Sequence, residues 1–181
     1  MVSIAICCYN EEKYLRDTVD TVLSAVEAAN IVGVDIIIVD DGSVDSTAEV
    51  ICELKEKFPF IRIISHFSNE GLGKSILDAM KIAKCPKLCF IPGDNDMSHN
   101  LIRDLLVHRD KADFLVTYFV NKEVRGKVRN IISTLYQWFY MCVFDTYLLY
   151  LNGPGLYPVE KCLKLGLKSK RMSIHAELHV R

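Results

Sequence analysis

Two carboxylates, one residue apart, follow an apolar segment near the middle of the chain. Leu88 to Ile91 is apolar, and a Pro-Gly pair leads from it to Asp94 and Asp96. Carboxylate oxygens are the hard ligands that Mg²⁺ takes in proteins, often together with substrate phosphates. The spacing therefore predicts that Asp94 and Asp96 hold a metal ion against the phosphates of a ligand. The alternative is that both carboxylates only cap a loop.

Two further polar clusters come directly after apolar segments. Val2 to Cys8 leads into Tyr9-Asn10-Glu11-Glu12, and Asp35 to Val39 leads into Asp40-Asp41-Gly42-Ser43. Apolar runs without alternation are typical of strands buried on both faces of a parallel sheet. The second cluster also contains good turn formers, so an ordinary turn is an alternative interpretation.

Expected strands and helices alternate along the first two thirds of the chain. The expected strands are Val2–Cys8, Asp35–Val39, Phe60–Ile64, Lys87–Ile91 and Asp113–Phe119. Short connections and amphipathic helices between them predict an α/β fold with a mostly parallel, open sheet and helices on both faces. In such sheets ligands bind outside the carboxyl ends of the strands. The three polar clusters are therefore expected to meet at one edge.

A glycine-rich loop precedes the third expected helix. Gly73-Lys74-Ser75 is the ending of a P-loop, but that motif needs a glycine at position 68, which is Ser68. The dinucleotide fingerprint fails as well, because Ile76 stands where its third glycine would fall. The loop can still offer backbone N–H groups to an anion at the helix start.

The last third of the chain has a different character. A basic patch of Lys122, Arg125, Lys127 and Arg129 runs into an apolar, aromatic stretch at 131–151. The stretch is long enough to span a bilayer, but polar residues interrupt it and its Trp and Tyr favour the membrane interface. Three interpretations stay open: a helix lying in the membrane surface, a core or dimer-interface helix, and a transmembrane helix.

Composition limits the class of protein. The chain has 181 residues, half of them hydrophobic, which suits one domain over 1–181. A net charge of −1 gives no general attraction to nucleic acid. Seven scattered cysteines without a CxxC pair indicate reduced thiols, and no signal-peptide pattern opens the chain, so a cytoplasmic location is expected. The chain stops straight after a helix-like segment, which suggests either a truncated C-terminus or an unusually short natural chain.

In their order and spacing, these motifs resemble the family 2 glycosyltransferases with the GT-A fold, especially the branch that includes dolichol-phosphate mannose synthase. The segments that carry the resemblance are Val2–Glu12, Val39–Thr47, Asn69–Gly73, Asp94-x-Asp96, Arg129-x-x-x-Ser133 and Glu177. The resemblance implies an inverting enzyme that uses Mg²⁺ or Mn²⁺ and moves a sugar from a UDP- or GDP-sugar. It also implies a polyprenyl (lipid) phosphate as the acceptor.

Carried over residue by residue, the resemblance implies the following roles. Tyr9, Glu11, Asp40 and Asp41 would hold the base and ribose, Asp94 would lie by the ribose and phosphate, and Asp96 would bind the metal. Arg129 and Ser133 would hold the acceptor phosphate, and Arg125 or Lys122 would compensate for Phe119, which stands where relatives often place an arginine. Asp94 or Glu177 would serve as a base if the acceptor were a hydroxyl group. Residues 1–119 would then bind the nucleotide sugar, and 120–181 would face the acceptor and the cytoplasmic membrane surface.

Other functions remain as alternatives. One alternative is a saccharide acceptor, and another is a catalytically weak protein that only binds nucleotide sugars. A nucleotidyltransferase is less well supported, because its first strand is usually followed by a glycine-rich basic loop, unlike Tyr9–Glu12. His175 and His179 have the helical spacing of a zinc site, but no third ligand is evident. A homo-oligomer also stays open.

Overall fold

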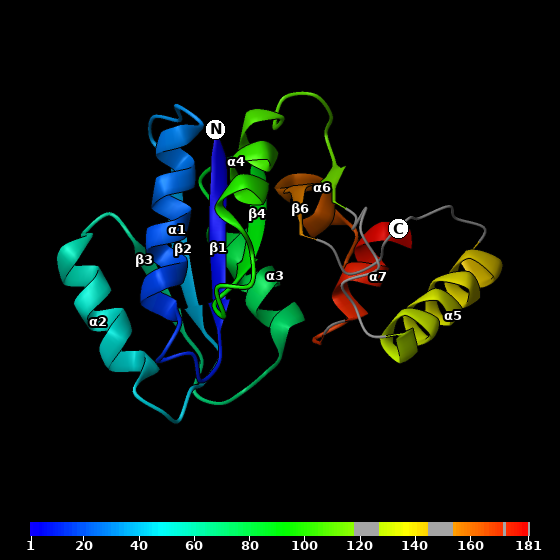
Figure 1. Cartoon of the computed structure of the whole chain (residues 1–181), viewed down its shortest axis with the longest axis horizontal. Coiled ribbons are helices and arrows are strands. Elements are labelled where there is room, and N and C mark those ends of the chain that lie inside the picture. Colours follow the sequence, from blue (N-terminus) through cyan, green and yellow to red (C-terminus); the bar gives the residue numbers. More distant parts are fainter. Residues whose placement is uncertain (118–126, 145–153, 172, 181) are drawn as a thin grey trace.

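The first expected strand lies at the centre of the sheet. In this computed structural model, which describes residues 1–117, 127–144, 154–171 and 173–180, β1 (Val2–Cys8) pairs in parallel with β2 (Asp35–Asp40) and β4 (Lys87–Pro92) (Figure 1). All seven residues of β1 are buried. Its unbroken apolar run is therefore explained by coverage on both faces.

Six strands form one sheet among the described residues, in the order β3-β2-β1-β4-β6-β5. β3 (Arg62–Ser65) extends the parallel part beyond β2. β6 (Gly155–Pro158) is antiparallel both to β4 and to β5 (Leu115–Val116). The α/β fold with a mostly parallel, open sheet is thus confirmed.

The far edge of the sheet differs from the expectation. β6 was not predicted, because a four-residue strand that starts with glycine and ends with proline resembles a turn. The fifth expected strand, at 113–119, is reduced to Leu115–Val116 within the described residues, and it pairs with β6 instead of with a parallel neighbour.

Helices cover both faces of the sheet (Figure 1). One face packs against α1 (Leu15–Ala28), α2 (Thr47–Lys57) and α4 (His99–Val107), and the other against α3 (Leu72–Ile82), α6 (Val159–Lys164) and α7 (Ser173–Val180). Successive β1 side chains alternate between the two cores, with Ile4 and Ile6 in the first and Ala5 and Cys7 in the second.

α5 (Lys127–Phe144) projects from the rest of the molecule in Figure 1. Its residues Trp138, Phe139 and Leu135 are 61%, 57% and 61% exposed, so they lie outside both cores. None of the helices in the described part of the chain combines the length and the apolarity that a membrane span requires.

Two histidines of α7 lie in the second core. The Tyr157 hydroxyl lies 3.3 Å from Nδ1 of His175, and the Phe114 ring centroid lies 5.4 Å from that of His179. Burial lowers the pKa of both histidines from 6.5 to about 4, with a smaller contribution from His179 at His175. No cluster of three metal-binding side chains occurs among the described residues, so the zinc interpretation gains no third ligand.

These buried histidines make the fold sensitive to acid. Between about pH 6.5 and pH 4 the unfolded chain protonates them while the folded chain keeps them neutral, so acid favours unfolding. Their stabilising effect is complete above pH 6.5 and is lost as the pH falls toward 4. For His175 the shift from 6.5 to about 4 corresponds to on the order of 3 kcal/mol.

Urea denaturation at about pH 7 and about pH 4.5 checks this prediction. We expect His175→Asn to lose less free energy of unfolding between the two conditions than the unmodified chain does. His99→Asn, outside this core, is the matched control. Equal acid losses in the unmodified chain and in His175→Asn would show that burial of His175 is not the cause.

Candidate functional site

The ends of β1, β2 and β4 meet at one edge, as predicted. The register pairs Cys8 with Asp40 and Cys7 with Pro92. The pairing continues one residue further on each side, because the Asp41 N–H donates to the Cys8 carbonyl at 2.9 Å and the Gly93 N–H donates to the Cys7 carbonyl at 2.8 Å. The residues that follow these strands are therefore held beside one another.

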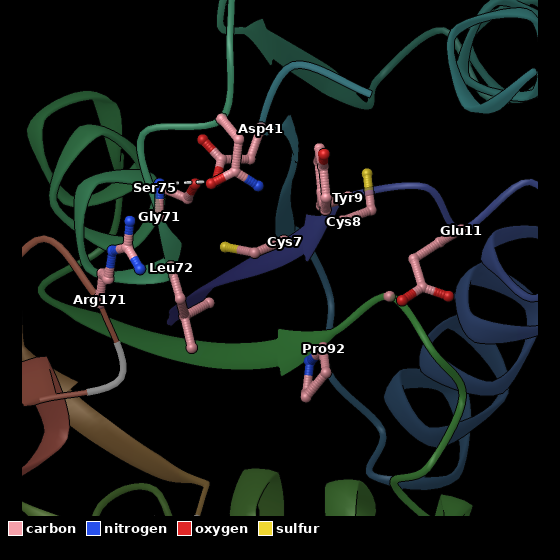
Figure 2. A pocket seen from close by; sticks show the side chains of 12 residues that line it. Cys7, Cys8, Tyr9, Glu11, Asp41, Gly71, Leu72, Ser75, Pro92 and Arg171 are labelled. Atoms are coloured by element: carbon pink, nitrogen blue, oxygen red, sulfur yellow. Dashed lines mark hydrogen bonds between the residues drawn. The ribbon is translucent and has the colours of Figure 1, made fainter. Parts of the chain in front are cut away.

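A cavity of about 380 Å³ opens at this edge (Figure 2). It is lined by Cys7, Cys8, Tyr9, Glu11, Asp41, Asn69, Gly71, Leu72, Ser75, Pro92, Gly93 and Arg171. Three of the predicted nucleotide-binding residues, Tyr9, Glu11 and Asp41, are among them. The described chain thus brings together side chains from the first, second and third βα connections.

Asp40 and Asp41 have different surroundings. Asp40 accepts hydrogen bonds from the Ser43 N–H at 3.0 Å and from the Ser43 hydroxyl at 2.6 Å, so its side chain closes a turn. Successive side chains on an extended chain point to opposite faces, and Asp41 is therefore the one that lines the cavity. Asp40 is thus part of a turn, as in the alternative interpretation, whereas Asp41 lines the cavity.

The loop after β1 is tied to the loop after β2. Asn10 has a φ of 59°, its N–H donates to the Ser43 hydroxyl at 2.9 Å, and its side-chain oxygen accepts the Val44 N–H at 2.8 Å. The Glu11 N–H donates to the Thr47 hydroxyl at 2.8 Å. These bonds place Tyr9 and Glu11 at the cavity.

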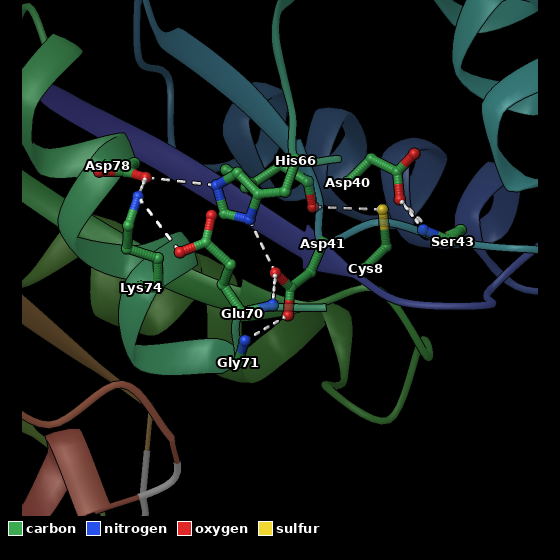
Figure 3. A network of polar contacts seen from close by, with 10 residues as sticks. Cys8, Asp40, Asp41, Ser43, His66, Glu70, Gly71, Lys74 and Asp78 are labelled. Carbon is green, nitrogen blue, oxygen red and sulfur yellow. Dashed lines mark hydrogen bonds and ion pairs between the residues drawn. The ribbon is translucent and has the colours of Figure 1, made fainter. Parts of the chain in front are cut away.

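His66 was missed by the sequence interpretation. It follows the last residue of β3, and its Nδ1 lies 2.7 Å from Oδ1 of Asp41 (Figure 3). Asp41 also accepts the N–H groups of Glu70 at 3.0 Å and Gly71 at 2.8 Å. Three donors thus fix the carboxylate of Asp41. The one available signal was position, since His66 directly follows a strand in a sheet whose other strand ends are polar.

A second carboxylate faces the other side of the His66 ring. Nε2 of His66 lies 3.3 Å from Oδ2 of Asp78. Asp78 in turn forms ion pairs with Lys74 and, at 2.7 Å, with Lys81. The hydrogen bond to Asp78 raises the pKa of Lys74. The lysine of the P-loop-like ending is therefore committed to this network (Figure 3).

Two N–H groups of the glycine-rich loop also donate hydrogen bonds within the protein. The Gly71 N–H donates to Asp41, and the Lys74 N–H lies 3.2 Å from the Lys170 carbonyl and 3.0 Å from that of Gly71. These are two of the donors that a bound anion would require at the start of α3.

Asp94 and Asp96 stand exposed just beyond β4. Asp94 Oδ1 accepts the Asp96 N–H at 3.1 Å across Asn95, whose φ is 56°. The Gly93 carbonyl before them accepts the Thr18 hydroxyl of α1 at 2.8 Å. Neither aspartate lines the cavity itself.

Negative charge accumulates between these aspartates and the cavity. Burial raises the pKa of Glu11, and the nearby carboxylates of Asp94 and Asp45 raise it further. Among the described residues no three His, Cys, Asp or Glu side chains form a metal site of their own. Asp94 and Asp96 are exposed, and the Glu11 carboxylate is near Asp94. These carboxylates fit a divalent cation that takes its other ligands from substrate phosphates and water.

The remaining predicted residues lie elsewhere. Glu177 of α7 accepts the N–H groups of Lys168, at 3.1 Å, and Ser169, at 2.8 Å, and it does not line the cavity. Ser133 lies half-buried on α5. Arg125 and the side chain of Arg129 are outside the described residues.

Two cavity-lining thiols are unsuited to nucleophilic chemistry. Burial raises the pKa of Cys7 and of Cys8, and nearby carboxylates add to the effect at both. Both groups therefore remain protonated at neutral pH, when a nucleophile would need the thiolate. All seven cysteines are free in this structure.

Comparison with known sequences identifies similar proteins. A family model described as glycosyl transferase family 2 matches residues 3–161. A poly-beta-1,6-N-acetyl-D-glucosamine synthase of Staphylococcus aureus is 34% identical over 127 residues, which is 70% of this chain and 27% of the relative. A cholesterol galactosyltransferase of Borreliella burgdorferi is 29% identical over 112 residues, 62% of this chain and 30% of the relative.

Solved structures share the fold. S. aureus TarS 1–349 in complex with UDP-GlcNAc superposes with a TM-score of 0.68 at 16% identity, covering 98% of this chain and 53% of that one. Glucosyl-3-phosphoglycerate synthase from Mycobacterium tuberculosis, with Mn²⁺, UDP and phosphoglyceric acid, gives 0.67 at 17% identity, covering 98% and 62%. The chain therefore spans about a third or less of these curated relatives and about half to two thirds of these solved structures.

The contacts of His66 predict its effect on stability. His66→Leu should lower the free energy of unfolding by roughly 2 kcal/mol, because the buried carboxylate of Asp41 loses the hydrogen bond from Nδ1 of His66. His66→Asn, which can keep a donor toward Asp41, should lose less. Urea denaturation at neutral pH measures both variants.

The matched control is His108→Leu, which removes a histidine from the end of α4 and far from Asp41 in the sequence. If His66→Leu and His66→Asn lose equal amounts, the hydrogen bond to Asp41 contributes little to the fold.

Proposed function

This chain belongs to glycosyl transferase family 2, and we propose that it moves a sugar from a nucleotide-sugar donor to a phosphate acceptor. One observation carries the proposal. Tyr9, Glu11 and Asp41 line one cavity, at the sheet edge from which Asp94 and Asp96 project. That arrangement supports a nucleotide in the cavity and its diphosphate toward the aspartates.

We propose a uridine or guanosine diphosphate sugar as the donor. Tyr9 is 44% exposed, and its ring offers a face for stacking against a base. Within the residues that the structure describes, Oδ2 of Asp41 accepts only the Gly71 N–H, so its second lone pair can accept an N–H or O–H group of the base or ribose. UDP is the first nucleotide to test, because the solved relatives above were crystallised with UDP or a UDP-sugar.

The carboxylates of Asp94 and Asp96 are the proposed ligands of Mg²⁺ or Mn²⁺. A bound cation of this kind neutralises negative charge on the leaving diphosphate. Asp94, whose charge raises the pKa of Glu11, would face the ribose and phosphate side, and Asp96 the cation. The charge that accumulates there supports this assignment, since it is unfavourable until a cation arrives.

The proposed reaction is a single displacement with inversion at the anomeric carbon. An acceptor oxygen forms the new bond to that carbon while the bond to the diphosphate breaks, and the electron pair leaves with the diphosphate. A phosphate monoester has a second pKa of about 6, so it is already an anion at neutral pH and needs no strong base. The chain then has mainly to position the two substrates.

The acceptor is proposed to be a polyprenyl phosphate, as in the dolichol-phosphate mannose synthase branch. α5 exposes a long apolar and aromatic surface, and the sequence just before and at its start is basic, with Arg125 and Arg129. Aromatic residues and a basic start suit a helix at the surface of an anionic membrane. Ser133 on this helix would contact the lipid phosphate. We therefore propose that the protein acts at the cytoplasmic face of a membrane, with 1–119 holding the donor and 120–181 facing the acceptor.

A saccharide acceptor is the second candidate, favoured by the names of relatives such as the poly-beta-1,6-N-acetyl-D-glucosamine synthase. A sugar hydroxyl needs a general base, for which Asp94 and Glu177 are available. In this structure Glu177 accepts two backbone N–H groups, which stabilise its charge but occupy its oxygens. That commitment supports the phosphate acceptor.

The metal site gives the first functional prediction. Asp96→Asn should weaken UDP binding in the presence of Mn²⁺ by on the order of 10-fold to 100-fold and should remove the dependence on Mn²⁺, because a charged ligand is lost. Isothermal titration with and without Mn²⁺ measures this. Asp110→Asn, on the exposed surface after α4, is the matched control. If UDP affinity were the same with and without Mn²⁺ and the same in Asp96→Asn, the metal site would be contradicted.

The acceptor site gives the second functional prediction. With polyprenyl phosphate in phosphatidylcholine vesicles, Ser133→Ala should raise the acceptor KM by about 5-fold to 10-fold, the effect of one lost hydrogen bond. The donor KM should stay constant. Radiolabelled sugar transfer to the lipid measures both values. Transfer only to oligosaccharides, across a panel of UDP- and GDP-sugars, would favour the second candidate.

A further inference from the structure

The segment before α7 reaches back to the glycine-rich loop at the start of α3. The Lys74 N–H donates to the Lys170 carbonyl at 3.2 Å. A Cβ atom on Gly73 would lie 2.3 Å from the Ser169 carbonyl oxygen, and one on Gly71 would lie 2.5 Å from that of Lys170. The two backbones are in such close contact that glycine is required at both positions.

Glu177 holds the same segment from the other side. Its carboxylate accepts the N–H groups of Lys168 and Ser169, and the first turn of α7 begins with the Ile174 N–H donating to the Arg171 carbonyl at 3.0 Å. Arg171 is therefore fixed by its backbone although its side chain is exposed. Figure 2 shows this side chain at the cavity, beside Leu72 and on the side away from Glu11.

The charges around the cavity distinguish Arg171 from its neighbours. Lys74 is paired with Asp78, and the carboxylate of Asp41 is occupied by His66 and the Glu70 and Gly71 N–H groups. In the described part of the chain, the guanidinium of Arg171 makes no ion pair. It is the one arginine or lysine among the lining residues of this cavity, where it faces an otherwise acidic and neutral wall.

We propose that Arg171 binds a phosphate group of the donor nucleotide in this cavity, an inference that rests on the proposed function. A guanidinium presents paired N–H donors that match two phosphate oxygens. Two of the N–H donors at the start of α3 are used within the protein, and a diphosphate has two sources of positive charge: a cation at Asp96 and the Arg171 side chain. Together they hold the leaving group from two sides.

Nucleotides with and without phosphate test the proposal. Arg171→Gln should weaken binding of UDP by on the order of 10-fold to 100-fold, the effect of losing charge-assisted hydrogen bonds, and leave uridine binding unchanged. Arg171→Lys keeps the charge but loses the paired donors, so its UDP affinity should lie between those of the unmodified chain and Arg171→Gln. Lys170→Gln removes the same charge from the adjacent exposed residue and should change neither affinity. Isothermal titration at fixed Mn²⁺ measures all four proteins.

Several outcomes would overturn the assignment. Equal losses for uridine and UDP would mean that Arg171→Gln disturbs the cavity as a whole, and urea denaturation would show the accompanying loss of stability. Unchanged UDP affinity with a raised KM for polyprenyl phosphate would place the acceptor phosphate at Arg171 instead.

Inorganic pyrophosphate separates this inference from the proposed function. If pyrophosphate binding depends on Arg171 but no nucleotide binds, the anion site stands and the proposed donor is wrong. If nucleotides bind equally to the unmodified chain and to Arg171→Gln, the donor proposal stands and the role of Arg171 is wrong. Failure of the unmodified chain to bind either probe would overturn both.

Discussion

The parallel register of three strands controls the rest of the site. β1 pairs with β2 and β4 so that Cys8 lies beside Asp40 and Cys7 beside Pro92. One step of slippage in either pair would turn every side chain to the other face of the sheet. The buried, unalternating residues of β1 favour this arrangement because both faces must be covered by helices. The polar residues after the three strands meet as a consequence of that packing.

Negative charge is concentrated at this edge. Burial and the charges of Asp94 and Asp45 raise the pKa of Glu11, which means that its ionised form is disfavoured in the folded chain. Such repulsion lowers stability unless a cation is present, and ligands that bind only the folded state then stabilise it. Asp41 is a contrast, because His66 and two backbone N–H groups stabilise its carboxylate. The charge of Asp41 is therefore stabilised within the protein, whereas the repulsion between Glu11 and Asp94 is relieved only when a cation binds.

Strong local patterns made the parallel part of the fold predictable from the sequence. Buried strands and acidic strand ends are set by neighbours in the chain, so Tyr9, Glu11 and Asp41 could be placed at one edge before any coordinates. β6 could not, because four residues with glycine and proline become a strand only through pairing with β4 and β5. His66 and Arg171 were missed for a similar reason. Their neighbours lie far away in the sequence, and a single histidine or arginine carries no pattern. The position of Asp40 away from the cavity follows from the turn it makes with Ser43, a choice that the sequence left open.

The contact between Gly73 and the Ser169 carbonyl links two parts of the chain that are almost a hundred positions apart. A methyl group at position 73 would overlap that carbonyl, so the start of α3 can carry a larger residue only when the segment before α7 takes another path. Glycine at this position is thus a marker of the path of a distant segment. In a related chain, a larger side chain there would indicate a rearranged C-terminal wall, and an aligned arginine could then no longer be assumed to reach the same cavity.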